Sequence, residues 1–168
     1  AVEHLFEVIE SSPATSSRPA DYIDAHPIEY RELTYYGSYT LQYVFSQFLE
    51  GGQTGLRGHL MRSVLDDLAP EAQLRLYAET GQEYFDEWKA GAIRISEQHD
   101  MEWIKENQPA IWLLLQMIDE YVKLISCFHQ INFCGGKDKT IFQNVTKNKK
   151  EIIYNLLLYT LRDSNPGP

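Results

Sequence analysis

The chain has 168 residues, of which 43% are hydrophobic and 23% charged, a balance typical of a soluble globular domain and not of a disordered one. Its formal net charge of −9 at pH 7 divides into −12 over residues 1–136 and +3 over the last 32. Because residues 1–136 are so acidic, they repel phosphate backbones, which excludes nucleic acid as the main partner. The basic end is interpreted as a solvated rim.

Apolar residues recur at helical spacing through the first 68 residues. The pattern predicts a short amphipathic helix over 1–11 and another that opens at Pro27. Between them, the Ser- and Pro-rich segment 11–27 is predicted to be extended. Two longer apolar stripes at 41–49 and 56–68 predict two further amphipathic helices, the first ended by a Gly-Gly pair.

The middle of the chain carries several breakers. Pro70 is predicted to open a helix with Tyr77 facing inward, and Gly81 to end or weaken it. Ala90-Gly91 is predicted to be a break, followed by a short polar helix capped by Ser96.

Residues 109–133 form the longest and most apolar segment. Charged residues interrupt it, and its longest apolar run is far below the roughly 20 residues that a bilayer needs, so a buried helix is expected and not a membrane span. A closing helix is predicted over about 147–162. The expected fold is therefore all-α: one compact bundle of about six to eight helices over 1–168, around a long central apolar helix near 109–133, with a short disordered tail at 163–168.

The histidines are candidate metal ligands. Three of them precede a glutamate by three positions, a spacing that puts both groups on one helical face, at His4/Glu7, His26/Glu29 and His99/Glu102. No H-x-x-x-H motif is present, and these pairs are interpreted as solvated surface residues. A second set, His59, His99, Asp100 and Asp119, resembles the H…HD…D ligands of helical metal-dependent phosphohydrolases. The resemblance implies four metal ligands and a metal-bound water as nucleophile.

No complete motif for nucleophilic catalysis or phosphate binding is found, and no cofactor is expected. Cys127 and Cys134 do not form a secreted disulfide framework, which favours an intracellular, cytoplasmic protein. The last four residues, Asn165-Pro166-Gly167-Pro168, are similar to the end of viral ribosome-skipping peptides, but Asp163 stands where that family has Glu, and a simple Pro/Gly chain end is expected.

An aromatic group within an acidic frame offers the remaining site hypothesis. Rings can anchor a partner while carboxylates steer its approach. The candidate binding residues are Glu83, Tyr84, Asp86, Glu87, Trp88 and Trp103. The favoured function is an acidic, aromatic-rich interaction domain for a basic or amphipathic protein partner, without catalysis of its own. The alternatives are the metal-dependent phosphohydrolase and a fragment of a larger helical scaffold.

Overall fold

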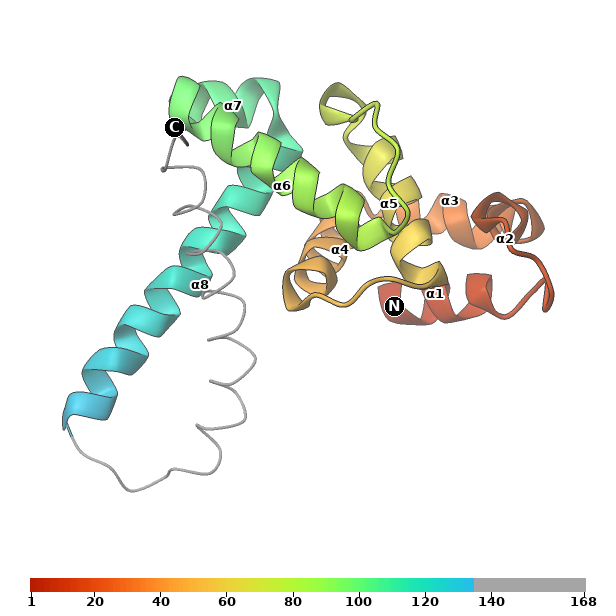
Figure 1. Cartoon of the computed structure of the whole chain (residues 1–168), viewed down its shortest axis with the longest axis horizontal. Coiled ribbons are helices and arrows are strands. Elements are labelled where there is room, and N and C mark those ends of the chain that lie inside the picture. Colours follow the sequence, from red (N-terminus) through yellow and green to blue (C-terminus); the bar gives the residue numbers. More distant parts are fainter. Residues whose placement is uncertain (135–168) are drawn as a thin grey trace, which may run out of the picture. The chain divides into compact units, whose positions relative to one another are not determined.

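The computed structural model describes residues 1–134, which group into one compact unit over 1–115 and the start of a second unit from residue 116. The described residues contain eight α-helices and no strand, which confirms the all-α fold (Figure 1). Their bounds are α1 Val2–Glu10, α2 Pro19–Ala25, α3 Pro27–Tyr35, α4 Ser38–Glu50, α5 Leu56–Leu68, α6 Gly81–Gln98, α7 Met101–Asn107 and α8 Pro109–Cys134, with a 3₁₀ turn η1 at Pro70–Ala72.

The helices in the first 68 residues follow the apolar stripes. The predicted faces of α1, α4 and α5 are buried, because each stripe recurs at i, i+3 and i+4 and points to one side. The break after α4 is made by Gly51 and Gly52, both at positive φ. Where the sequence predicts an extended segment over 11–27, residues 19–25 instead form α2, with Pro19 at its first position.

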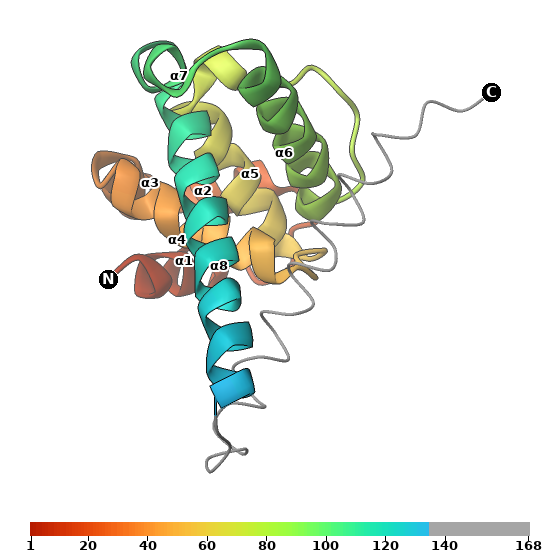
Figure 2. The same cartoon turned by 90° about the vertical axis from the view of Figure 1, so that its left-hand side faces the viewer.

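The centre of the first unit is α5. It packs against α1, α2, α3, α4 and α6, and the turn η1 follows it directly. Figure 2 shows the orange α3 to the left of the yellow α5 and the green α6 to its right. Between α4 and α6 the core is aromatic: the rings of Phe48 and Phe85 stack at 4.7 Å, and Trp88 lies 5.4 Å from Phe45.

α6 corrects two sequence predictions. Gly81 begins this helix and does not end one, and the helix runs through Ala90-Gly91 without a break. Thr80 caps it, because its side-chain oxygen accepts the Glu83 backbone N–H at 3.1 Å. A glycine is required at 81 because a Cβ there would lie 2.1 Å from the Gly58 carbonyl oxygen of α5.

The helix predicted after Pro70 is limited to the single turn η1. Residues 73–80 are not helical, and Tyr77, expected to face inward, is 89% exposed. The segment is tied instead through Leu74, whose backbone N–H donates to the Tyr84 hydroxyl at 3.0 Å.

α8 begins at Pro109 as predicted, but its place as the central helix is not confirmed. Within the first unit, Ala110, Ile111 and Leu114 are buried while Trp112 and Leu113 are only half-buried, so one side of the helix faces the core. Over the described residues, no helix has the length and apolar character to cross a bilayer. The closing helix at 147–162, the tail at 163–168 and the Asn165–Pro168 end lie outside the described residues, and the prediction of one domain over 1–168 stays a prediction.

Candidate functional site

Two of the predicted partner-binding aromatics belong to the core. Tyr84 and Trp88 are 0% and 2% exposed, because they lie on the buried stripe of α6 together with Phe85. Their rings are therefore not available to a partner in this structure. The sequence does indicate this burial if no break is assumed at Ala90-Gly91. The spacing then places one buried helical face at residues 81, 84, 85, 88 and 92.

The predicted carboxylates on α6 differ in what they already contact. Glu83 is engaged at the start of its helix, since its Oε2 accepts the Glu79 backbone N–H at 2.9 Å. Asp86 accepts a hydrogen bond from Gln82 at 3.1 Å and lies 4.0 Å from the Lys89 ammonium. Burial lowers the pKa of Lys89, and the nearby Asp86 carboxylate opposes that shift. Glu87 is exposed and makes no hydrogen bond or ion pair with another described residue, so it alone of the three is uncommitted.

Trp103 is the predicted anchor that the structure leaves accessible. It lies on α7, where Ile104 is buried and the six other residues are exposed. Its ring is 38% exposed and stacks on the His99 imidazole at 3.7 Å. Asp100 caps α7 by accepting the Trp103 backbone N–H at 2.8 Å. The Trp103 backbone is thus held by the Asp100 cap and its indole by the His99 ring, while part of the residue stays exposed.

Exposed carboxylates flank Trp103 along the chain. We define the α6–α7 corner as His99, Met101 and Trp103 together with Glu97, Asp100, Glu102 and Glu106. Residues 97–107 carry four acids and one base, a formal charge of −3. The base, Lys105, lies over the Trp112 ring at 5.0 Å. Figure 1 shows α7 at the end of α6 that points away from α1, α2 and α3.

Three of the four residues proposed as metal ligands make other contacts. Among the residues that the structure describes, no three His, Cys, Asp or Glu side chains are placed to hold a metal ion. His99 stacks on Trp103 and Asp100 caps α7. His59 is half-buried on α5, and Asp119 pairs with Lys123 at 2.7 Å. The resemblance to metal-dependent phosphohydrolases therefore gains no support from geometry.

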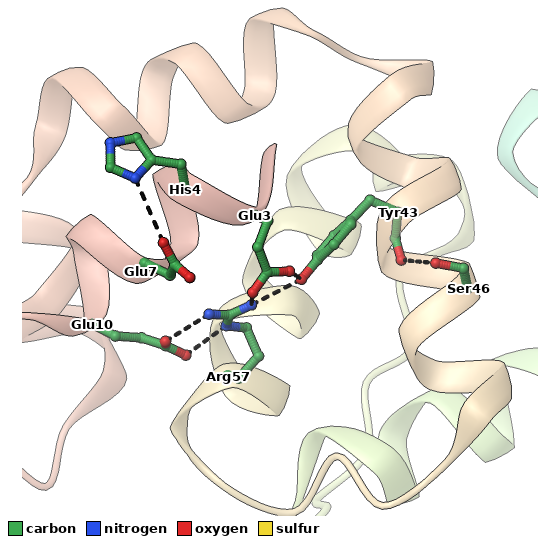
Figure 3. Close-up of polar contacts among 7 residues, drawn as sticks. All are labelled: Glu3, His4, Glu7, Glu10, Tyr43, Ser46 and Arg57. Carbon is green, nitrogen blue, oxygen red and sulfur yellow. Dashed lines mark hydrogen bonds and ion pairs between the residues drawn. The ribbon is translucent and has the colours of Figure 1, made fainter. Parts of the chain in front are cut away.

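Sequence patterns gave no indication of the most connected polar cluster, which lies around Arg57 (Figure 3). The guanidinium donates to both carboxylate oxygens of Glu10, at 2.6 and 2.7 Å, and to Glu3 at 3.0 Å. It also donates to the Tyr43 hydroxyl at 2.8 Å and lies over the Phe6 ring. The cluster joins α1 to α4 and α5. The guanidinium already donates four hydrogen bonds within the cluster, so we assign the cluster to stability.

The histidine–glutamate pairs found in the sequence have three different outcomes. His4 and Glu7 lie 3.5 Å apart on the exposed face of α1 (Figure 3). His26 and Glu29 lie 3.8 Å apart and are more buried, while His99 turns to Trp103 and not to Glu102.

No protein-family model, curated protein or solved structure matches this chain. The functional argument therefore rests on the arrangement of its side chains.

Proposed function

We propose that the chain is a protein-interaction module that binds a basic, amphipathic segment of a partner protein at the α6–α7 corner. One observation carries this proposal: the Trp103 indole is exposed and pre-positioned among carboxylates that have few partners of their own. The proposal keeps the setting inside the cell that the cysteine usage favours, and it involves no cofactor.

The chemistry of the corner fits a basic amphipathic ligand. Tryptophan and methionine are enriched in the buried centres of interfaces, where they provide large apolar contact areas. The Trp103 indole N–H makes no hydrogen bond within the described residues, so it can donate to a partner. Glu97, Glu102 and Glu106 likewise have no hydrogen bond or ion pair among those residues. A partner that carries lysines beside an apolar stripe would satisfy both features.

The stacked His99 also reduces the cost of binding. A side chain that is already held loses less conformational freedom when a partner covers it. The imidazole stacks on one face of the indole, and the Trp103 residue still keeps 38% of its surface exposed to a ligand.

A binding measurement with defined peptides tests the proposal. The probe is a fluorescent amphipathic peptide of leucines and lysines, and the matched control peptide replaces every lysine by glutamate. Fluorescence anisotropy should show saturable binding of the lysine peptide only. Trp103→Ala should weaken it at least ~10-fold, as for an interface hot spot, whereas Tyr77→Ala, which removes an exposed ring outside the corner, should not.

A second test of the proposal reverses the charge of two carboxylates in the α6–α7 corner. The double variant Glu102→Lys/Glu106→Lys should weaken binding at least ~10-fold. Glu71→Lys, at an exposed position on η1, is the control with one reversed charge. If the corner variants bind as the wild type does, the corner is not the site.

A further inference from the structure

Ser12, His26 and Glu29 form a linked group that lies outside the α6–α7 corner. The Ser12 hydroxyl is 2.8 Å from His26 Nε2, and His26 Nδ1 is 3.8 Å from Glu29 Oε2. We propose that this group is a Ser–His–Glu nucleophile site, which reacts with small activated acyl esters and organophosphonates. It goes beyond the proposed binding function and does not depend on it.

Three packed elements bring the group together. Ser12 follows the end of α1, where the Ser11 backbone N–H donates to the Val8 carbonyl at 3.1 Å. His26 is the single residue between α2 and α3, and Glu29 lies in the first turn of α3. α1 packs against both α2 and α3. The nucleophile and its base are therefore 14 positions apart in sequence but adjacent in space, which no short motif reveals.

The order of the groups suits general-base activation. When the Ser12 hydroxyl donates to Nε2, the ring proton of the neutral imidazole resides on Nδ1, the nitrogen that faces Glu29. The carboxylate then holds the ring in this tautomer and stabilises the imidazolium that forms during the reaction. At 3.8 Å the His26–Glu29 contact is longer than a hydrogen bond, as is common before a reactant is bound. Glu29 is therefore a positioning residue.

The group is shielded but reachable. The side chains of His26 and Glu29 are 16% and 31% exposed, and Ser12 is half-buried. Partial burial strengthens the interaction of the imidazolium with the carboxylate relative to a fully exposed pair. Because none of the three residues is fully buried, we expect a small reagent to reach the hydroxyl.

The reaction balances without any cofactor. Ser12 Oγ attacks the acyl carbon of the ester while His26 takes the hydroxyl proton. The bond from the acyl carbon to the leaving oxygen then breaks, and the proton passes from His26 to the departing alcohol. Water, activated by the same imidazole, hydrolyses the acyl-serine, which releases the carboxylic acid and restores the hydroxyl. With a fluorophosphonate, Ser12 Oγ attacks phosphorus, the P–F bond breaks, and fluoride leaves with the proton that His26 has taken, so that a stable phosphonyl-serine remains.

Neighbouring serines provide matched controls. Ser17 is exposed and makes no hydrogen bond with a described residue, whereas the Ser16 hydroxyl donates to Asp21 at 2.6 Å. Neither has a histidine as partner, so neither should react with the probe.

The test uses the full chain and a fluorophosphonate probe, with the modified residue located by mass spectrometry. We expect labelling at Ser12, complete loss of that label in Ser12→Ala, and retention in Ser17→Ala. Removal of a general base typically costs ~10²-fold or more, so His26→Gln should slow labelling by ~10²-fold. The same preparations should hydrolyse p-nitrophenyl acetate in the same rank order.

Glu29 variants separate positioning from a purely structural role. Glu29→Gln should slow labelling at least ~10-fold, whereas Glu29→Asp should retain most of the wild-type rate, because it keeps the charge. Circular dichroism of each variant shows that it is folded. The proposal is overturned if the folded wild type is not labelled at Ser12, or if Ser12→Ala and wild type are labelled at equal rates.

Discussion

Arg57 connects three helices through one polar side chain. It donates to carboxylates from both ends of α1 and to a hydroxyl from α4, so three helices meet at one guanidinium. The Glu10 fork is bidentate, a geometry that arginine can form and lysine cannot. The cluster escapes sequence reasoning because its members are up to 54 positions apart and none belongs to a motif.

We predict that Arg57→Ala lowers the free energy of unfolding by ~1–3 kcal/mol, since it leaves the half-buried Glu10 carboxylate without its partner. Arg57→Lys should recover part of this loss through its charge. Urea unfolding monitored by circular dichroism measures both. Arg94→Ala, at an exposed position, should change stability by less than ~0.5 kcal/mol; equal effects at positions 57 and 94 would contradict the role assigned to the cluster.

A second prediction concerns acid stability. The Tyr43 hydroxyl, which donates to Glu3, and the Arg57 guanidinium lower the pKa of Glu3 below its ordinary value of 4.5. Since the folded pKa is lower than the unfolded one, the stabilisation by Glu3 is complete above about pH 4.5 and is lost as the pH falls through the lower folded value.

Glu3→Gln should therefore flatten the acid limb of the stability curve, by less than ~1 kcal/mol because the side chain is 54% exposed. Tyr43→Phe, which keeps the ring that stacks on Phe6, should produce part of the same change. Urea unfolding between about pH 5 and pH 3 provides the comparison. An unchanged acid limb in both variants would refute the assignment.

At the scale of elements, α6 explains both a success and a failure of sequence reasoning. The sequence pattern predicts its apolar residues correctly, but it also predicts breaks at Gly81 and Gly91, which the structure does not contain. In the structure, Gly81 lets the start of α6 approach the α5 backbone, and Gly91 lies within a continuous helix. Sequence alone does not distinguish a glycine that ends a helix from one that permits close packing, because both lack a side chain.

The two glycines should respond oppositely to alanine. Gly81→Ala would place a Cβ 2.1 Å from a carbonyl oxygen and 2.8 Å from a Cα of α5, neither of which can move without displacing the helix. We expect a loss of ~3 kcal/mol or more. At Gly91, the nearest atom to an added Cβ is the flexible end of Arg94 at 3.9 Å, so Gly91→Ala should stabilise by ~0.5–1 kcal/mol. Thermal unfolding of the pair checks the sign, and two changes of the same sign would contradict this account.

At the scale of the whole molecule, the fold class was predictable because it depends on the periodicity of apolar residues. The stripes of α1, α4 and α5 suffice to predict helices with one buried face. Hydrophobicity alone does not show which helix is central to residues 1–115. Within the first unit, α5 is the helix that packs against neighbours on several sides, although the most apolar segment of the chain is α8. Packing depends on which faces meet in space, and composition does not report that.

The candidate site can be predicted only in part, because composition does not show which aromatic rings are buried. Trp103 and its acidic surroundings could be recognised from composition, but Tyr84 and Trp88 look alike in sequence and are core residues. The Ser12–His26 contact was not predictable, since it depends on how the residues that follow α1 pack near α3.

The excess of acids over residues 1–136 makes the proposed binding sensitive to salt. Because exposed charges are screened beyond about 10 Å at 0.1 M ionic strength, an increase from about 0.05 to 0.5 M NaCl should weaken binding of the lysine peptide at least ~10-fold, mostly through slower association. Stopped-flow anisotropy separates the two rate constants. Salt-independent association would argue against electrostatic steering.

The central claim is that the exposed face of Trp103 is the contact point for a basic amphipathic partner. The chain has three tryptophans, at 88, 103 and 112, and their indole N–H groups give separate signals in a nitrogen–proton correlation spectrum, which can be assigned with a Trp103→Phe variant. During titration with the lysine peptide, we predict a saturable shift of the Trp103 signal and almost none for the buried Trp88. A Trp103 signal that stays unchanged at saturating peptide would contradict the claim.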